Sequence, residues 1–548
     1  MKRALSSFFT PEIMEKAGFI ERRGGGDPLI TALEYDSRKI KEGNLYFALP
    51  GFHTDGRLFI PEAVEKGAGA VIYQGEPPAF AEGIVYIQVR DSRFALSPLA
   101  DSYYDHPSGS LGIIGVTGTE GKSTTVYLIW QLLTLLGEKA GFVSTVQYSV
   151  GGEERWNPEH QTTPEATAIH RRLAEMRDYG ASWAVLESSS HGLSPRTNRL
   201  GDVAFDAGVM TNVAHEHLEF HGSWEQYRHD KANLFRSLGL FSHTKEIGGK
   251  KRDIPAFAVA NGDDRSCSYF AAAAFGKTGA AEKAPPGFRT YTYSTRGAAA
   301  DLRVKAVRSG AGGNRYRVLI REDDNSETEA EIEDRLPGAF NPGNVLAALL
   351  VTAKLTGKRI AELIPLVLRL KPVRGRMTRV DRGQNFEVLV DYAHTPSSFS
   401  AVFPPLRERM DRDGGRIISL FGSAGERDTA KRPEQGRIAA ECSDLMILTD
   451  EDPRGEEPIF ILEEIAAGIR DNEKKQWVRG DNLFLIPDRR QAIRKAFSLA
   501  RAGDLVLLLG KGHENSIIYA KGALAFDEIT EAEKALEEQR QDPGSLPD

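Results

Sequence analysis

Short apolar runs alternate along this chain with longer segments of helical periodicity. The runs fall at 44–49, 70–73, 111–116, 183–186, 209–213, 388–390, 417–421, 445–448 and 505–509. Continuous apolar runs of this length are typical of strands buried on both faces. Between them, segments such as 128–136 repeat apolar residues at the spacing of one helix face. The pattern predicts an α/β protein built on parallel sheets.

Changes in this pattern predict three domains, which is what 548 residues should hold. We expect residues 1–109 to form a small α/β domain with a helix near 60–66. We expect residues 110–371 to form a central domain with a parallel sheet like that of P-loop ATPases. For residues 372–548 the pattern predicts a Rossmann-like, doubly wound domain.

Two parts of the central domain depart from the parallel pattern. The stretch 302–332 alternates at Tyr316, Val318 and Ile320, which is typical of antiparallel strands. Residues 241–255 and 271–300 are rich in Gly, Ala, Lys and Pro, so we expect loops or an insertion there.

The strand predicted at 111–116 leads into a glycine-rich loop, Gly115-Val-Thr-Gly-Thr-Glu-Gly-Lys-Ser-Thr-Thr125, that opens a helix. Backbone N–H groups of such a loop close around phosphate oxygens, and the helix N-terminus adds positive potential. Lys122 is expected on the outer phosphates, and a Ser123 or Thr124 hydroxyl on Mg²⁺. Five residues separate Gly115 from Gly121, whereas the common P-loop has four. The alternative is a glycine-rich turn without a ligand.

Polar residues crowd the predicted strand ends, where open parallel sheets place ligands. In the central domain they are 187–192, 211–212 and 215–221. In the third domain they are 391–396, 422–432, 449–458 and 510–514. His215-Glu216-His217 could indicate zinc, but beside a phosphate loop we favour one His and one Glu supporting Mg²⁺. Most other histidines of that stretch are expected on the surface.

Composition narrows the function classes. A hydrophobic content of 41% and a charged content of 27% are ordinary for a soluble protein, and the net charge of −7 argues against a nucleic-acid partner. Two cysteines imply neither a disulfide framework nor a zinc site. With no signal peptide and no apolar run of membrane-spanning length, we expect a cytoplasmic protein without membrane insertion.

Taken in order, these stretches resemble the Mur ligase family of bacterial cell-wall synthesis over nearly the whole chain. The motifs are Gly118 to Thr124, Glu187 to His191, Thr211-Asn212, His217-Leu218-Glu219, Asn341 to Asn344, Gly375-Arg376-Met377 and Asp391 to Pro396. Asp36-Ser37-Arg38 and Gly510-Lys511-Gly512-His513-Glu514 are similar to the MurE branch, the UDP-N-acetylmuramoyl-tripeptide synthetases. Each motif is weak alone, whereas the ordered series is specific.

The resemblance implies an ATP-dependent acid–amino-acid ligase of peptidoglycan synthesis, and hence a role in cell shape and division. ATP and two Mg²⁺ would activate the D-Glu carboxylate of UDP-MurNAc-L-Ala-D-Glu as an acyl phosphate. A diamino acid would then displace phosphate. By resemblance, residues 1–109 bind UDP, 110–371 bind ATP and 372–548 bind the amino acid, in a protein expected to be a monomer.

The resemblance also implies site residues. The catalytic set is Lys122, Lys231, His217 and Glu187, with Ser123, Glu187, His217 and a carbamate on Lys231 as metal ligands. ATP would contact Gly118, Thr119, Gly121, Lys122, Ser123, Thr124, Asn341, Arg376 and Asp391. The UDP-MurNAc-dipeptide would contact Tyr35, Ser37, Phe52, His53, Thr54, Thr162, Thr163, Ser189 and Arg199. The amino acid would contact Arg427, Glu451, Asp452, Pro453, Arg454, Gly510 and Glu514.

The central motif of the amino-acid pocket is a hybrid. Diaminopimelate enzymes of the family usually read Asp-Asn-Pro-Arg, and here the motif is Glu451-Asp452-Pro453-Arg454. Arg454 suits a distal carboxylate as a bidentate partner. Asp452 adds a negative charge that suits a distal ammonium, as in lysine or ornithine. We favour meso-diaminopimelate because of Arg454. Glu120, Glu216 and Thr378 also depart from the usual family residues, and Glu120 puts a carboxylate near triphosphate.

Two alternatives remain open. One is a related ligase of the folylpolyglutamate synthase type, against which the Asp36-Ser37-Arg38 and 510–514 motifs argue. The other is a non-catalytic nucleotide-binding protein. The joint presence of Lys122, Glu187, His217, Lys231 and Arg376 argues against that second reading.

Overall fold

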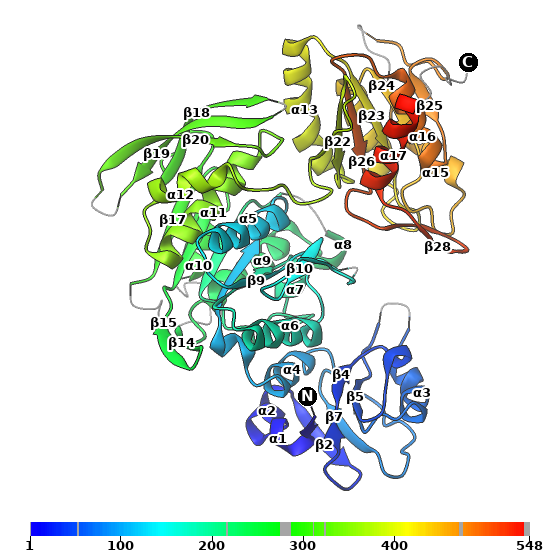
Figure 1. Ribbon diagram of the computed structural model, residues 1–548. Helices are drawn as coiled ribbons and strands as arrows, with labels where there is room; N and C mark the ends of the chain where they lie inside the picture. The colour runs from blue at the N-terminus through cyan, green and yellow to red at the C-terminus, as the bar shows by residue number, and fades with distance from the viewer. Residues whose placement is uncertain are drawn as a thin grey trace. The chain divides into compact units, whose positions relative to one another are not determined.

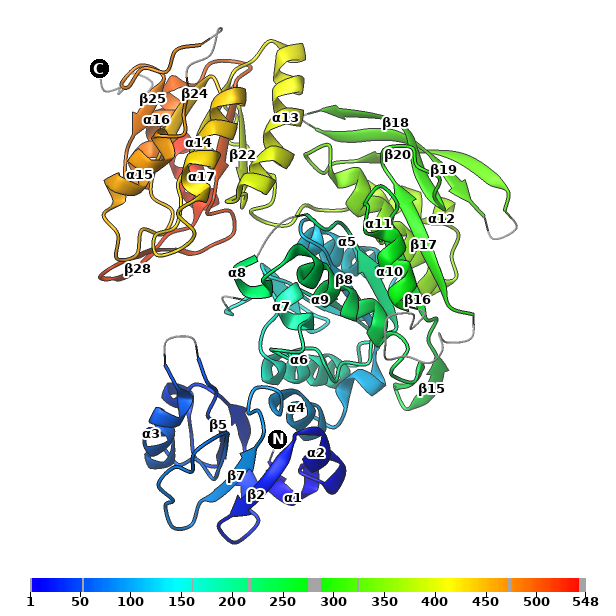
Figure 2. The same cartoon turned by 180° about the vertical axis from the view of Figure 1, so that it is seen from behind.

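The computed structural model describes residues 2–51, 54–159, 161–214, 218–274, 287–310, 312–322, 325–470 and 475–541 (Figures 1 and 2). The chain forms two compact units. One comprises Met1–Tyr293 and Ala347–Arg359, and the other comprises Ser294–Leu346 and Ile360–Asp548. Within the described residues, no helix is long and apolar enough to cross a membrane.

The first unit begins with a five-stranded sheet whose two faces are both covered. Its order is β2 (Phe19–Arg23), β7 (Val85–Val89), β6 (Ala70–Tyr73), β5 (Asn44–Phe47) and β4 (Ala32–Glu34), parallel except for β2. Leu45 and Phe47 pack toward α1 (Leu5–Phe8), α2 (Pro11–Lys16) and α4 (Leu96–Tyr103). Tyr46 faces the opposite side, toward α3 (Ile60–Glu65). The predicted strand 70–73 is confirmed to the residue.

The small elements of this region lie outside the five-stranded sheet. They are β1 (Arg3–Ala4), β3 (Leu29–Ile30), η1 (Ser37–Lys39), η2 (Gly56–Phe59) and η3 (Pro107–Ser110).

A second sheet in the same unit carries the glycine-rich loop. Its order is β11 (Arg155–Trp156), β10 (Gln147–Ser149), β9 (Ala140–Val143), β12 (Trp183–Glu187), β8 (Gly112–Thr117), β13 (Ala207–Met210), β16 (Phe257–Asn261) and β17 (Arg289–Ser294). Six neighbouring strands, β9, β12, β8, β13, β16 and β17, are parallel to one another. β10 pairs antiparallel with both β9 and β11. The strand β8 lies in the middle, between β12 and β13, so their carboxyl ends converge on one edge.

Helices pack against this sheet through a fully buried core. They are α5 (Lys122–Leu135), α6 (Ala166–Tyr179), α7 (Ser190–Leu193), α9 (Trp224–Ser237) and α10 (Cys267–Ala274), and the short α8 (Leu218–His221) contacts α9. Leu173 and Met176 of α6 and Leu234 of α9 belong to one buried cluster with Ile113 and Leu186 of the strands. The central strand β8 is therefore buried along its whole length.

The prediction of loops at 241–255 and 271–300 is wrong in part. β14 (Thr244–Ile247) and β15 (Lys250–Asp253) form an antiparallel hairpin, α10 continues to Ala274, and Arg289–Ser294 is the strand β17. Residues 275–286 lie outside the described residues.

The second unit contains antiparallel strands and a doubly wound domain. As the alternation predicts, β18 (Leu302–Gly310), β19 (Gly313–Arg321) and β20 (Glu327–Asp334) pair antiparallel in chain order. α12 (Ile360–Val367) contacts β20. α11 spans Asn341–Thr356, and its residues from Ala347 onward belong to the first unit.

The carboxy-terminal sheet is doubly wound. Its order is β21 (Thr378–Val380), β22 (Glu387–Asp391), β26 (Leu505–Leu509), β23 (Ile417–Phe421), β24 (Leu445–Leu448) and β25 (Leu483–Leu485), and β21 alone among these is antiparallel. Along β26, Leu507 joins the core under α13 (Pro396–Asp413), α14 (Lys431–Cys442) and α15 (Pro458–Ala466). Leu508 joins the core under α16 (Arg489–Leu499) and α17 (Glu528–Gln541). β27 (Ser516–Tyr519) and β28 (Gly522–Ala525) form a hairpin beyond β26.

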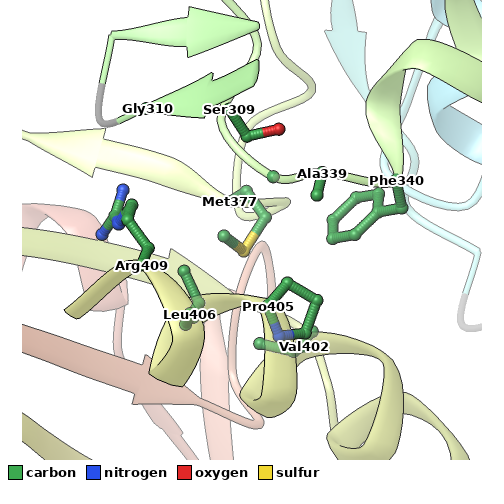
Figure 3. Close-up of a pocket in the computed structure, with 10 residues that line it drawn as sticks. Ser309, Gly310, Ala339, Phe340, Met377, Val402, Pro405, Leu406 and Arg409 are labelled. Carbon is green, nitrogen blue, oxygen red and sulfur yellow. The ribbon is translucent and has the colours of Figure 1, made fainter. Parts of the chain in front are cut away.

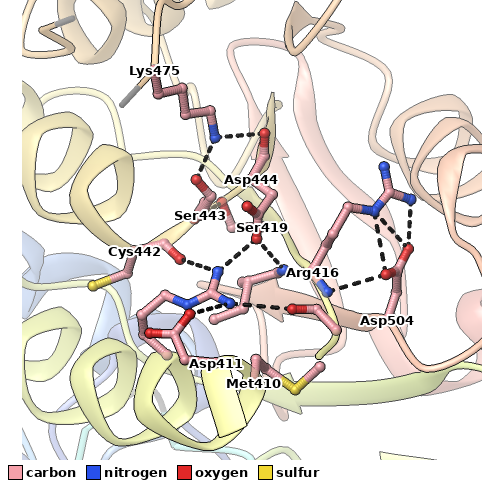
Figure 4. A network of polar contacts seen from close by, with 12 residues as sticks. Met410, Asp411, Arg416, Ser419, Cys442, Ser443, Asp444, Lys475 and Asp504 are labelled. Atoms are coloured by element: carbon pink, nitrogen blue, oxygen red, sulfur yellow. Dashed lines mark hydrogen bonds and ion pairs between the residues drawn. The ribbon is translucent and has the colours of Figure 1, made fainter. Parts of the chain in front are cut away.

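Carboxylates close the amino-terminal edge of this sheet (Figure 4). Asp504, just before β26, accepts both the backbone N–H and the guanidinium of Arg416, the latter at 2.6 Å. Asp444, just before β24, accepts the backbone N–H of Ile417 at 2.8 Å. Lys475 donates to the backbone carbonyls of Ser443 and Asp444, and burial lowers the pKa of Lys475 to about 8. These contacts fix the strand starts, so the opposite edge is left for ligands.

A small cavity of about 30 Å³ lies within the second unit (Figure 3). Phe340, Met377, Val402, Pro405 and Leu406 line it with apolar atoms. Its size matches about one water molecule, so we assign it no ligand.

Candidate active site

The glycine-rich loop has the geometry of an anion site. It joins the buried strand β8 to α5, whose first residue is Lys122. Gly121 caps the helix with φ 82°, and Gly118 has φ 151°. A Cβ atom at Gly118 would lie 1.9 Å from the Thr211 hydroxyl oxygen, so only glycine fits there. The ammonium of Lys122 is folded back onto the Thr119 carbonyl oxygen at 2.7 Å.

Side chains from α9 and from the end of β13 support this loop. The buried Thr119 hydroxyl pairs with the Tyr227 hydroxyl at 3.1 Å and accepts the Ala214 N–H at 2.9 Å. Lys231 is only 2% exposed, and its Nζ atom donates to the Gly118 carbonyl oxygen at 2.6 Å. The same ammonium lies 4.4 Å from the centre of the Tyr227 ring. Lys231 is therefore part of the loop's surroundings, although 113 residues separate it from Gly118.

Two expected magnesium ligands are in contact. The Ser123 hydroxyl donates to Glu187 Oε2 at 2.9 Å, and that oxygen also accepts the Thr145 N–H at 2.8 Å. Both side chains are buried. A hydroxyl and a carboxylate are hard oxygen donors, which suits Mg²⁺. The chemistry of the pair therefore fits a metal beside the loop, and Ser123 is the one of the two candidate hydroxyls that contacts Glu187.

Three expected site residues cannot be placed. Phe52, His53 and His217 lie outside the described residues, as do His215 and Glu216. Among the residues that the structure does describe, no group of three or more His, Cys, Asp or Glu forms a metal site.

Most other histidines of this stretch are predicted to lie on the surface, and His221 is an exception. It is 4% exposed, and its Nδ1 atom lies 2.8 Å from Asp230 Oδ2. Its Nε2 atom lies 3.1 Å from the Ser190 hydroxyl. Asp230 immediately precedes Lys231, so this buried chain of polar contacts ties α9 to α7. Spacing along the chain gave no signal of it, because the three residues come from different elements.

Hydrogen bonds of its backbone N–H and carbonyl groups hold Glu120 in place. Its N–H donates to Asn212 Oδ1 at 2.9 Å, and its carbonyl oxygen accepts the Thr211 hydroxyl at 2.6 Å and Asn212 Nδ2 at 3.1 Å. The position therefore tolerates Glu without loss of these contacts, and the bonds explain why Thr211-Asn212 matters to the loop.

The expected dipeptide residues converge in the first unit. Thr163 Oγ1 accepts the Ser189 N–H at 2.9 Å, and the Thr163 carbonyl oxygen accepts the Arg199 guanidinium at 2.9 Å. Arg199 also forms an ion pair of 2.9 Å with buried Glu165. Burial and the nearby carboxylates Glu159 and Glu165 raise the pKa of Tyr35. Thr162, next in the chain to Thr163, is half-buried.

Expected uridine contacts lie at one edge of the amino-terminal sheet. Ser37 follows β4, and its hydroxyl donates to Glu62 at 2.8 Å. Thr54 is exposed in the turn after β5, where its carbonyl oxygen accepts the Gly51 N–H at 3.0 Å. Since β4 and β5 are parallel neighbours, both residues follow carboxyl ends of the same sheet.

The expected ATP residues of the second unit divide into two groups. The Arg376 guanidinium lies 4.8 Å from the Tyr392 ring centre. Asp391 accepts the Met377 and Ala393 N–H groups at 2.8 Å each, and burial raises its pKa while Arg376 opposes the rise. The Thr378 hydroxyl accepts the Gly375 N–H and so closes this turn. Asn341 lies at the start of α11, where it donates to the Pro337 carbonyl oxygen.

The expected amino-acid residues gather where β24 and β26 end. Glu451 is 6% exposed, and its Oε2 atom would lie 3.1 Å from a Cβ atom at Gly510. Burial raises the pKa of Glu451, and Lys431, Lys511 and Arg489 oppose that rise. Pro453 is buried, and Arg454 has a left-handed φ of 56° and donates its N–H to Ile518. Arg427 is exposed on the loop after β23.

Two residues here were not expected as partners. Lys511 is fully buried, and its Nζ atom lies 2.8 Å from Asp452 and 2.5 Å from Glu514. Tyr392 donates to Glu514 at 3.2 Å. The carboxylates of this region are therefore partly occupied by the protein's own donors.

Comparisons with known families cover most of the chain. The profile described as "Mur ligase family, catalytic domain" matches residues 29–104. "Mur ligase middle domain" matches 116–352, and "Mur ligase, glutamate ligase domain" matches 375–512.

Curated relatives match at full length. A protein of Treponema denticola named UDP-N-acetylmuramyl-tripeptide synthetase is 50% identical over 94% of this chain and 95% of its own. A protein of Geobacillus kaustophilus named UDP-N-acetylmuramoyl-L-alanyl-D-glutamate–2,6-diaminopimelate ligase is 35% identical over 94% of this chain and 96% of its own.

Solved structures agree on the fold. One of a UDP-N-acetylmuramoyl-L-alanyl-D-glutamate–2,6-diaminopimelate ligase has a TM-score of 0.60 at 27% identity, covering 98% of this chain and 100% of its own. A folylpolyglutamate synthase of Mycobacterium tuberculosis has a TM-score of 0.54 at 14% identity, covering 75% of this chain and 91% of its own. The latter likeness shows the fold alone.

Proposed function

The chain belongs to the Mur ligase family and is an ATP-dependent ligase of peptidoglycan synthesis, and we propose that it adds a diamino acid to the D-Glu of UDP-MurNAc-L-Ala-D-Glu. The observation that supports this most is the loop from Gly118 to Ser123, with Glu187 at hydrogen-bond distance from Ser123. The three-domain, mixed α/β fold is that of the family. We propose residues 1–109, 110–371 and 372–548 as its UDP-, ATP- and amino-acid-binding domains.

The reaction must bring two anions together, the D-Glu carboxylate and the triphosphate. Positioning and charge neutralisation dominate phosphoryl transfer. Lys122 would leave the Thr119 carbonyl and bind the outer phosphates, while the N-terminus of α5 donates its free N–H groups. Thr163, Ser189 and Arg199 would hold the dipeptide so that its carboxylate faces the γ-phosphate.

Ser123, Glu187 and His217 would hold Mg²⁺, and Lys231 would join them as a carbamate. Bound Mg²⁺ screens the phosphate charge and orients the transferring group. The carbamate fits because a bare ammonium repels a cation, whereas carbamate oxygens are ligands that Mg²⁺ prefers. The acyl phosphate formed on D-Glu would then react with the amine of the diamino acid and release phosphate.

Arg454 favours meso-diaminopimelate, because a guanidinium can donate two bonds to its distal carboxylate. L-lysine and L-ornithine are the alternatives. We also propose that the enzyme acts in the cytoplasm as a monomer, without a nucleic-acid partner.

Phosphate release by the purified protein tests the proposal. With ATP, Mg²⁺ and UDP-MurNAc-L-Ala-D-Glu, we expect release that depends on a diamino acid and is lost in Lys122→Ala. Absence of release with diaminopimelate, lysine and ornithine alike would overturn the ligase assignment. Release that needs a folate and no uridine substrate would favour the folylpolyglutamate alternative. Equal or better use of lysine or ornithine would overturn the preference for diaminopimelate.

A further inference from the structure

The Asp452 carboxylate is held by donors of the protein itself. Its Oδ1 atom accepts Lys511 Nζ at 2.8 Å and the Ile518 N–H at 2.9 Å. The Asp452 side chain is 10% exposed, and that of Lys511 is 0% exposed. A buried carboxylate that already has a buried ammonium and a backbone N–H as partners is a poor receptor for a further ammonium.

The same carboxylate also fixes the loop that carries Arg454. Ile518 lies in β27, and its carbonyl oxygen accepts the Arg454 N–H at 2.9 Å while its own N–H goes to Asp452. Tyr519 donates its hydroxyl to Asp450 at 3.0 Å. Residues 450–454 are thus bound to β27 at three points, so Asp452 helps to set the backbone position of Arg454.

Lys511 is shared between two carboxylates. Its Nζ atom also lies 2.5 Å from Glu514 Oε2, and the Glu514 side chain is 33% exposed. One ammonium and two carboxylates leave one negative charge. Asp452 is the buried member and has two donors on one oxygen. Glu514 has Lys511 and the Tyr392 hydroxyl as donors, but its side chain reaches solvent. The uncompensated charge therefore falls on Glu514, where a ligand can meet it.

An asparagine at 452 would change the charge and keep the geometry. Its Oδ1 atom can accept the same two hydrogen bonds from Lys511 and Ile518. Lys511 would then have a single counter-ion, Glu514, and the group would be neutral. The carboxylate at 452 thus changes what Glu514 presents to a ligand.

We propose that Asp452, Lys511 and Glu514 form a charge relay that tunes the amino-acid pocket, with Lys511 as a positioning residue. Asp452 acts on recognition of the diamino acid's ammonium through Lys511 and Glu514, without touching the ligand. This inference rests on the proposed function for the identity of the ligand. The internal pairing on which it depends is testable without activity.

Thermal unfolding tests the pairing. We expect Lys511→Met to lower Tm, because it leaves Asp452 without its counter-ion. The double variant with Asp452→Asn should regain part of that loss, since a neutral amide needs none. Lys475→Met is the matched control, because Lys475 donates to the backbone carbonyls of Ser443 and Asp444 at the opposite edge of the same sheet; adding Asp452→Asn there should restore nothing. If the double variant Lys511→Met with Asp452→Asn had no higher Tm than Lys511→Met alone, the proposed relay would be overturned. If Lys511→Met did not fold and the double variant did, that result would support it.

Steady-state kinetics test the action on the ligand. Asp452→Asn should raise the KM for the diamino acid about fivefold in the wild-type background and less than about twofold in Glu514→Gln, the size of coupling expected between residues of one network. The KM for ATP should stay unchanged. An equal effect in both backgrounds would show direct contact between Asp452 and the ligand and overturn the relay. If the wild-type protein turned over no diamino acid, the proposed function would fail, and the Tm series would still decide the pairing.

Discussion

The Nζ atom of Lys231 donates a hydrogen bond of 2.6 Å to the carbonyl oxygen of Gly118. A lysine of α9 thus meets the loop that opens α5. The ammonium is buried, and the Tyr227 ring lies beside it. Any chemistry that converts this amine into an anionic ligand would place that ligand beside the glycine-rich loop, which is why Lys231 is a better candidate for carbamylation than an exposed lysine.

Lys231→Ala should nearly abolish turnover, with a loss of at least about 100-fold in kcat, the scale of removing a group that stabilises charge in the transition state. Added bicarbonate should not restore activity, since alanine has no amine to carbamylate. Phosphate release over a bicarbonate series would measure this, with Tm confirming that the variant folds. Full activity would refute the carbamate assignment.

Ser123→Ala should raise the Mg²⁺ concentration needed for half-maximal activity by about tenfold, roughly the loss of one ligand hydrogen-bonded to a carboxylate. The reason is that the proposed metal would lose the hydroxyl ligand that lies 2.9 Å from Glu187 Oε2. A Mg²⁺ titration of phosphate release measures the shift. Thr124→Val is the comparison, because both hydroxyls were candidates in the sequence. A larger shift in Thr124→Val would reassign the ligand.

Arg199→Met should raise the KM for UDP-MurNAc-L-Ala-D-Glu by about 10- to 100-fold, the range for a lost charge-assisted hydrogen bond, and leave the KM for ATP unchanged. Arg199 links Thr163 to Glu165, so its loss also leaves a buried carboxylate with fewer partners. Arg196→Met is the matched control, since Arg196 is exposed nearby. Similar KM values in both variants would argue against a substrate role for Arg199.

The stability of Asp450→Asn, measured relative to the wild-type protein, should increase as the pH rises. Burial raises the pKa of Asp450 to about 6, from an ordinary value of 3.8. A carboxyl whose pKa is raised by folding binds a proton more tightly when folded, so its contribution to stability falls as the pH rises from about 4 to above 6. The Tm difference, variant minus wild type, should therefore be larger at pH 7.5 than at pH 4.5. A difference independent of pH would contradict this.

The strands were the most predictable part of the fold. The apolar runs at 70–73, 417–421, 445–448 and 505–509 coincide with β6, β23, β24 and β26, because strands covered on both faces must be apolar throughout. The β14–β15 hairpin was missed for the same reason. All residues of β15 are exposed and half of β14 is, so neither carries an apolar signal.

The sequence by itself determined the family and the glycine-rich loop, since a strand, a glycine-rich turn and a helix start are set by neighbouring residues. Only the tertiary structure decided which side chains meet. In the fold Lys231 donates to the Gly118 carbonyl oxygen, and buried His221 contacts Asp230. Lys511 forms ion pairs with both Asp452 and Glu514. Lys231 and Gly118 lie 113 residues apart in the chain, and Lys511 and Asp452 lie 59 apart. His221 and Asp230 are nine residues apart, and Lys511 and Glu514 are three apart, but helix or strand spacing alone does not bring their side chains together. The free energy of a charged contact depends on distance and burial in the fold, which spacing along the chain does not encode.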